Sequence, residues 1–391
     1  MDRKQKTLAA GTLVIFIFCL GLTGASAAPQ PLVRELQDQL DLNFFDRYWS
    51  ELDNEVREYM PGLHWQILME RLQAGEAVLE PGQILTGLSR MFMGEVALHL
   101  RLMGQLLLLA VAAAFLKNLE TAFEREQVAT LTRSILFIVL IGICLHSFST
   151  AMQTAGQAIG NMADFTLAML PTLLALLAAQ GSLASSAMFH PLVIFGISFF
   201  STAFRNVIIP LIFLSTVLGL VNHFSPHFKV GKLADFFRDL SMWGSGISMT
   251  VFVGILALQG TAGTVADAVS LRTAKYMTGA FVPVVGKMLS DAVETVAGAS
   301  IILKNGIYLS GAVLLMLLTL FPLVKLAAVA IIYKLSAALI QPLGETNLGE
   351  AVNTMGNALV LLLGALAAAS LIFFLAVTVV VGAGNAAIMF R

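Results

Sequence analysis

Residues Phe165–Phe204 read FTLAMLPTLLALLAAQGSLASSAMFHPLVIFGISFFSTAF and contain no Asp, Glu, Lys or Arg. Other uncharged runs cover Ala351–Phe390, Ser134–Ala163 and Leu240–Ala266. About 20 consecutive apolar residues are enough for a helix to span the roughly 30 Å hydrocarbon core of a bilayer. The runs therefore predict membrane-spanning helices. They lack the alternation of polar and apolar residues that a membrane β-barrel requires.

The composition of the whole chain points to the same class. Of its 391 residues 58% are hydrophobic and only 12% are charged, whereas soluble domains average about 45–50% and about 25%. Such a chain cannot cover a water-soluble globule with polar side chains, which argues against a soluble enzyme. We therefore predict an all-α fold, a polytopic α-helical membrane protein. With a net charge of −1 and no basic run beyond the first residues, nucleic acid is not an expected partner.

The amino terminus has the pattern of a secretory signal peptide. Three basic residues (Arg3, Lys4 and Lys6) precede the apolar run Leu8–Leu22 and the small residues Gly24–Ala28. We expect residues 1–27 to form the signal, with cleavage after Ala27 or Ala28; an uncleaved first anchor is the alternative. Only Cys144 lies beyond the signal, so no internal disulfide is expected.

Residues 28–100 are predicted to form a small, helical, exported segment. Pro29–Glu95 contains five basic and twelve acidic residues, a net charge of −7. Apolar residues recur at helical spacing, which predicts short amphipathic helices: Leu32, Leu36, Leu40, Phe45, Trp49, Leu52 and Val56. The segment is either a solvated cap on the membrane part or a docking surface for a partner outside the membrane.

The remainder, residues 101–391, is predicted to be a multi-pass membrane domain with seven or eight spans. Two of the candidate helices meet at Arg205 and Pro210 and form either a tight hairpin or one bent helix, and Leu326–Ile340, which contains Lys334, is a candidate re-entrant segment. The candidates are Leu102–Leu116, Ser134–Met152, Phe165–Ala179, Pro191–Phe204, Asn206–Val221, Gly244–Thr261, Gly306–Val324, Leu326–Ile340 and Met355–Val381.

The positive-inside rule predicts an orientation for these spans. With the amino-terminal segment exported, the basic loop Lys117–Arg133 is cytoplasmic. If Arg205 is an external hairpin tip, Asn222–Trp243 is cytoplasmic too. If all later candidates cross, Gln341–Thr354, with two Glu and no basic residue, is external. Thiol labelling at Arg205, Arg272 and Gly349 is then expected from the exported side.

Residues 264–305 do not fit a plain spanning helix. Lys287, Asp291 and Glu294 share one helical face, and a charged residue at a span centre costs about 2.5–3.5 kcal/mol. One interpretation is an amphipathic helix on the membrane surface. The other is a helix, broken at Pro283 and Gly286, that lines an aqueous path or a subunit seam.

This segment also resembles a known family. Ala274-Lys275, Phe281–Gly286 and Leu289–Val293, followed by Leu303–Gly306, Pro322–Lys325, Tyr333–Leu335 and Ala338–Pro342, are similar to the stage III sporulation protein AE family. The resemblance covers nearly the whole chain. The candidate pore or assembly residues are Asp267, Lys275, Pro283, Gly286, Lys287, Asp291, Glu294, Lys304, Asn305 and Lys325.

The resemblance implies an integral subunit of a secretion-like channel between mother cell and forespore, in the mother-cell membrane around the forespore. It further implies a role in forespore maturation and late forespore gene expression. The implied partners are ring-forming and other membrane subunits, a partner ATPase and a forespore membrane protein. The family supplies no catalytic residues, and we expect no cofactor. A metal site at His223 and His227 is disfavoured because two nitrogens fall short of the usual ligand set. An independent secondary transporter is the alternative function.

Overall fold

The computed structural model describes residues 43–59, 66–67, 81–123, 126–224, 229–281 and 285–389. Every secondary-structure element in these ranges is helical, which confirms the predicted all-α class. In chain order the elements are α3 (Asn43–Tyr59), α5 (Pro81–Phe123), α6 (Glu126–Ala179), α7 (Leu183–Ala203), the π-helix η1 (Phe204–Ile208), α8 (Ile209–Phe224), α9 (Gly231–Phe281), α10 (Val285–Ile340), the 3-10 helix η2 (Gln341–Leu343) and α11 (Thr346–Met389).

Six helical segments in the described ranges are long and apolar enough to cross a membrane, so the polytopic class is confirmed. Of the six, the segments on α10 and α11 are the most buried and those on α5 and α9 the least. The bundle is therefore built around α10 and α11, with α5 and α9 at its periphery. The segments are Leu85–Lys117, Ser134–Ala179, Leu183–His223, Gly231–Gln259, Ser300–Leu343 and Thr346–Gly382.

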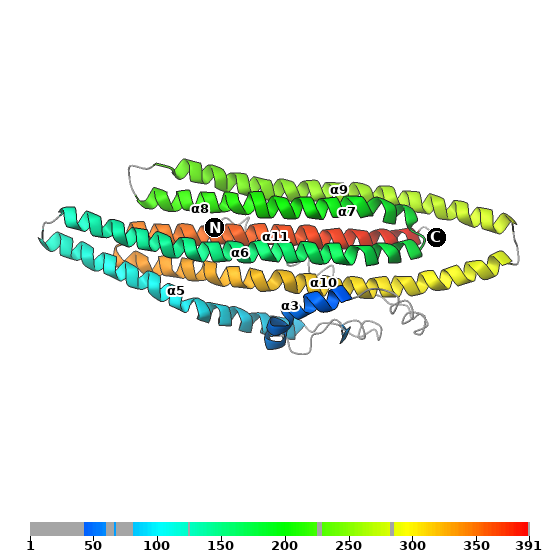
Figure 1. The fold of residues 1–391 in the computed structure, drawn as a ribbon, viewed down its shortest axis with the longest axis horizontal. Helices are drawn as coiled ribbons and strands as arrows, with labels where there is room; N and C mark the ends of the chain where they lie inside the picture. The colour runs from blue at the N-terminus through cyan, green and yellow to red at the C-terminus, as the bar shows by residue number, and fades with distance from the viewer. Residues whose placement is uncertain are drawn as a thin grey trace.

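There are six segments rather than the expected seven or eight because three pairs of apolar runs are each continuous. Runs that were candidates for separate spans lie end to end in α6, in α7–η1–α8 and in α10. The helices are consequently long. Ser134–Ala179 has 46 residues, about 69 Å at 1.5 Å per residue, roughly twice the thickness of a bilayer core. Figure 1 shows the result, a bundle of long helices that run nearly parallel to one axis.

At Arg205 the chain continues as one helical segment and does not turn back as a hairpin. Of the two predicted alternatives, the bent helix is therefore the one that the structure shows. Pro210 has no N–H and its ring clashes with the carbonyl one turn earlier. The chain accommodates this with a single π-turn, in which the Ile209 N–H donates to the Phe204 carbonyl. Arg205 therefore lies on the side of the bundle, midway along a span, and not at a hairpin tip.

The α10–α11 turn lies at the same end of the bundle as the α5–α6 connection. The Lys117 ammonium donates to the Gly344 carbonyl at 2.8 Å and lies 3.6 Å from Oε1 of Glu345. The expectation that residues 341–354 lie on the opposite side from residues 117–133 is therefore wrong. It failed because it counted the two halves of continuous helices as separate crossings.

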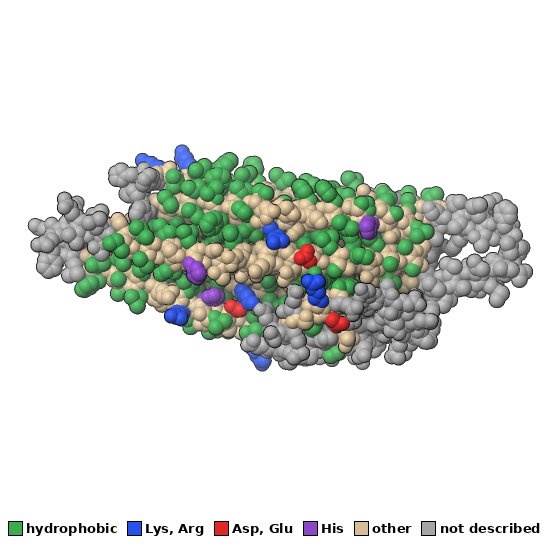
Figure 2. All heavy atoms as spheres, viewed as in Figure 1, with side chains coloured by type: hydrophobic (Ala, Val, Ile, Leu, Met, Phe, Trp, Pro, Cys, Tyr) green, Lys and Arg blue, Asp and Glu red, His purple; other side chains and the backbone are tan. Residues whose placement is uncertain are grey.

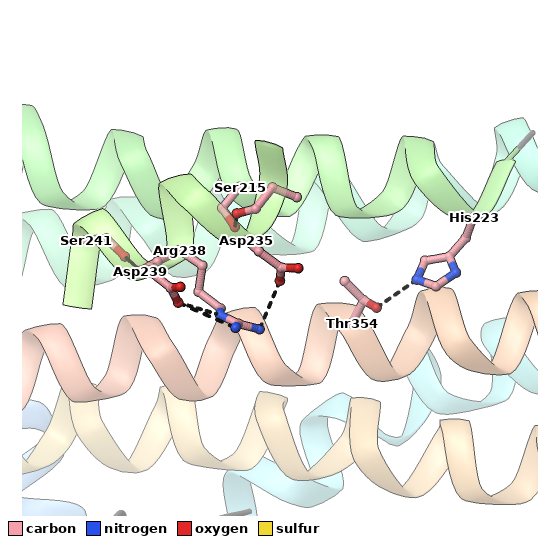
Figure 3. A network of polar contacts seen from close by, with 8 residues as sticks. Ser215, His223, Asp235, Arg238, Asp239, Ser241 and Thr354 are labelled. Atoms are coloured by element: carbon pink, nitrogen blue, oxygen red, sulfur yellow. Dashed lines mark hydrogen bonds and ion pairs between the residues drawn. The ribbon is translucent and has the colours of Figure 1, made fainter. Parts of the chain in front are cut away.

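The α8–α9 connection also lies at this end (left in Figure 1). Close to it, Arg238 of α9 lies 3.3 Å from Asp235 and 3.4 Å from Asp239 (Figure 3). His223 of α8 hydrogen-bonds to Thr354 of α11 at 3.1 Å. Charged and polar side chains thus mark this end of the bundle.

At the other end, α9 and α10 continue past α6, α7 and α11 (Figure 1). The extension includes most of residues 264–305, which are helical apart from 282–284, where the structure gives no description. The segment is therefore two arms of long helices, and its described backbone is helical throughout.

Within the segment predicted to be exported, the first described element is α3, which packs on the outside of the bundle. The rings of Phe44, Phe45 and Tyr48 lie 5.4–6.1 Å from the ring of Phe165 of α6, and Trp49 is buried. Asp46 of the same helix is exposed. α5 then runs without interruption through the expected boundary at residue 100.

Candidate functional site

Two of the predicted residues, Asp267 and Lys304, lie on either side of the turn that joins α6 to α7. Asp267 of α9 is 1% exposed. Its Oδ1 accepts hydrogen bonds from the backbone N–H of Ala184 at 2.8 Å and of Ser185 at 3.3 Å, and Oδ2 also lies 3.3 Å from the Ser185 nitrogen. These are the second and third N–H groups of α7, which a helix cannot satisfy by itself. Asp267 therefore caps α7 from a neighbouring helix.

The cap requires α9 to approach α7 closely, and a glycine makes this possible. Gly263 lies one turn before Asp267, and a Cβ at this position would lie 2.7 Å from Oγ of Ser185 and 3.2 Å from its Cα. The residue at the usual capping position, Ser182, makes no side-chain capping bond. The carboxylate of Asp267 takes over that role across 82 to 83 residues of sequence.

Lys304 of α10 binds the other side of the turn. Its side chain is 1% exposed, and its Nζ donates to Oε1 of Gln180 at 3.1 Å and to the Val381 carbonyl of α11 at 3.3 Å. Gln180 directly follows the last residue of α6. An anion at the start of α7 and a cation at the end of α6 both match the helix dipoles. The two charges thus fix the α6–α7 turn against α9, α10 and α11.

The structure places the other candidates along α9 and α10 and brings none of them to this turn. Asn305 and Lys325 are half-buried on α10. Lys275 lies on α9, and Gly286, Lys287, Asp291 and Glu294 lie in the first turns of α10, but their side chains fall outside the described part, as does Pro283. Whether these residues form one polar face remains a prediction from their spacing.

A further polar feature, missed in the sequence, lies on α6. Six exposed polar residues follow one another at intervals of three or four, which places them on one face of the helix. We call this set the α6 polar stripe: His146, Thr150, Gln153, Gln157, Asn161 and Asp164. A search for amides at helical spacing would have found it. Charge alone does not indicate the stripe, because its first five residues are uncharged or weakly basic.

Arg205 borders the stripe. One of its guanidinium nitrogens lies 3.3 Å from where a Cβ of Gly160 would be, so the side chain crosses α6 next to Asn161. In Figure 2 charged side chains of both signs lie near mid-length on one face of the molecule, surrounded by a largely apolar surface. A polar zone therefore interrupts the apolar surface halfway along the bundle.

The chemistry of these groups is that of binding and positioning. Among the residues that the structure describes, no group of three or more His, Cys, Asp or Glu side chains is placed to hold a metal ion. His223 contacts Thr354 at 3.1 Å and Glu350 at 3.6 Å, and residues 225–228, which include His227, lie outside the described ranges. Asp267 caps a helix, Lys304 and His223 join helices, and the α6 polar stripe faces outward.

Comparison with known proteins gives a consistent answer. The family model for stage III sporulation protein AE matches residues 63–384. The stage III sporulation protein AE of Bacillus subtilis (strain 168) is 35% identical over 362 residues, which cover 93% of this chain and 90% of that protein. No solved structure matches the chain. With a family model that covers most of its length and a relative of this similarity, the chain belongs to the stage III sporulation protein AE family.

Proposed function

We propose that this protein is an integral membrane subunit of a channel that links mother cell and forespore during sporulation. The observation that carries the proposal is the combination of family membership with a bundle of six apolar helical segments. A membrane-embedded core part suits such a machine because long helices provide a rigid scaffold for neighbouring subunits. Its role is forespore maturation and late forespore gene expression.

The proposed location is the mother-cell membrane that surrounds the forespore, with the acidic amino-terminal segment outside the cytoplasm. The proposed partners are other membrane subunits, a ring-forming subunit, a forespore membrane protein and an ATPase. The arms of α9 and α10 support this arrangement, because they extend past α6, α7 and α11 at the end opposite the basic connections. α3 adds surface on the side of α6, where it packs on Phe165. The arms offer surface to partners outside the membrane.

We further propose that the chain has no catalytic activity of its own. Its two best-defined buried charges, Asp267 and Lys304, bind backbone and amide groups of the same chain. Groups engaged in this way position helices. Energy for transport then comes from the partner ATPase.

Deletion of the gene in its own host tests the proposal. The expected result is engulfed forespores that fail to mature, a loss of heat-resistant spores and of a late forespore reporter, and rescue by the wild-type gene. Affinity purification of the full chain from sporulating cells should recover the ring-forming subunit. Normal spore counts after deletion, or uptake of a solute by the purified chain alone in liposomes, would overturn it in favour of a dispensable protein or an independent transporter.

A further inference from the structure

We propose that the α6 polar stripe forms one wall of a water-filled path across the membrane, which neighbouring subunits complete. The occupants of the path are water and small hydrophilic solutes. This inference rests on the proposed channel function and adds to it the surface along which solutes move. The segment singled out in the sequence, residues 264–305, is a different part of the molecule.

The first observation is that the stripe faces away from the protein. All six of its residues are exposed, whereas the opposite side of α6 supplies core residues such as Cys144, Phe148, Ala155 and Ile159. The helix is therefore polar outside and apolar inside, the reverse of an ordinary membrane-spanning helix at the edge of a bundle.

The second observation is that most of the stripe has no partner within the described part of the chain. The Thr150 hydroxyl bonds to the His146 carbonyl of its own helix at 3.2 Å. Gln153, Gln157 and Asn161 form no hydrogen bond with any described residue, and Asp164 forms no ion pair with one. Amides and carboxylates in lipid without hydrogen-bond partners are strongly unfavourable. These side chains must therefore meet water or another polar surface.

The third observation is that the rest of the bundle at this level is apolar. Thr319 of α10 contacts Met162 of α6 at 3.1 Å, and the two helices are antiparallel, so residues 331–339 lie level with residues 142–150, where the stripe begins. Ile331, Leu335 and Leu339 are 44–47% exposed there. Exposed apolar residues around the same level indicate lipid contact. The stripe is thus a polar strip at membrane depth and not part of a generally wet surface.

The length of the stripe fits a crossing of the bilayer. From His146 to Asp164 the helix rises about 27 Å, close to the roughly 30 Å of a hydrocarbon core. Asp164, with Arg205 nearby across Gly160, lies at the end of the stripe farther from the basic loops. Polar residues within spans characteristically face the bundle interior or a water-filled cavity, and here the bundle interior is already occupied by apolar side chains.

Thiol labelling in membranes from sporulating cells tests the inference. In a chain with Cys19→Ala and Cys144→Ala, single cysteines replace His146, Thr150 or Gln153, and a charged, membrane-impermeant thiosulfonate reports water access. Ile331→Cys and Leu335→Cys are matched controls, exposed at the same level but on the apolar side. We expect the stripe cysteines to react at least about ten-fold faster than the controls, because reaction requires exposure to water as a thiolate.

Equal rates at stripe and control positions would overturn the inference, and so would protection of the stripe together with disulfides to another subunit, which would indicate a helix–helix contact. As a second measurement, the triple variant Gln153→Leu/Gln157→Leu/Asn161→Leu should lose at least about ten-fold in heat-resistant spores at unchanged protein level. Unchanged counts would contradict the path but leave the channel proposal intact, because that proposal is tested by the deletion and liposome experiments.

Discussion

Asp267, which belongs to α9, caps the first turn of α7. A capping residue ordinarily belongs to the helix that it caps. A charged acceptor that is buried and bonded to two N–H groups makes stronger hydrogen bonds than a neutral cap. Because the contact is buried, water cannot replace the carboxylate when it is removed. The first turn of α7 and its packing against α9 therefore depend on one side chain.

Replacement of Asp267 by Ala should destabilise the protein by about 1–3 kcal/mol, since it leaves the Ala184 and Ser185 N–H groups buried without an acceptor. Asn, which retains one acceptor oxygen, should lose less. Thermal unfolding of the full chain in detergent measures the effect. Asp239→Ala, which removes an exposed carboxylate of the same helix, is the control; an equal loss in both variants would refute the capping role.

Lys304 and Gln180 are expected to be energetically coupled. Lys304→Met removes the charge together with its need for partners, whereas Gln180→Leu leaves the buried ammonium with one acceptor fewer. We therefore expect Gln180→Leu to be the more destabilising single change, and the double variant to be more stable than additivity predicts by about 0.5–3 kcal/mol. Additive melting shifts across the four proteins would contradict the coupling.

The sequence pointed to both charges but not to their partners. Asp267 and Lys304 were noticeable because charge is rare in this chain, yet Ser185 lies 82 residues from Asp267 and Gln180 lies 124 from Lys304. Spacing along one helix cannot indicate such contacts. The amides of the α6 polar stripe were visible in principle, because a single helix determines their common face.

At the level of elements, close approach between α7 and α9 should depend on Gly263. Gly263→Ala places a Cβ against the backbone of Ser185, so we expect destabilisation even though Ala is the better helix former. Gly254→Ala on the same helix meets nothing within 4 Å and should stabilise by up to about 1 kcal/mol. Opposite shifts in the melting temperatures of the two variants are the expected result, and a stabilised Gly263→Ala would contradict the close contact.

Helix type was predictable, whereas helix continuity was not. The uncharged runs indicate apolar helices, but the end of an uncharged run does not mark the end of a membrane span. At Arg205 the chain instead continues through the π-turn that Pro210 imposes, and α6 and α10 continue past Pro171 and Pro322. Proline is tolerated inside membrane helices because neighbouring groups satisfy the freed backbone. A proline or a charge in such a helix therefore does not mark its boundary.

For the whole molecule, the corrected helix count changes the predicted topology. With six crossings, the start of α5 and the end of α11 lie on the same side of the membrane. The opposite end contains the α5–α6, α8–α9 and α10–α11 connections, near the basic residues Lys117, Lys229, Lys232 and Arg238. The positive-inside rule places this end in the cytoplasm. The acidic amino-terminal segment is then external, which agrees with the signal peptide predicted from the sequence.

This orientation predicts that the α10–α11 turn is cytoplasmic and that the carboxyl terminus is external. The test uses the chain expressed in vegetative cells, where the exported side of the membrane faces the medium. A cysteine at the exposed position Asn347 should then react with an impermeant thiol reagent only after the cells are permeabilised. A cysteine at Gly82, exposed before the first span, should react in intact cells, and an alkaline phosphatase fused after Arg391 should be active. Labelling of Asn347→Cys in intact cells would mean that the α10–α11 turn lies outside. Lys117 at the end of α5 donates to the Gly344 carbonyl of that turn at 2.8 Å, so the two connections lie on the same side of the membrane. The whole bundle would then be inverted, with its basic end outside the cytoplasm, against the positive-inside rule.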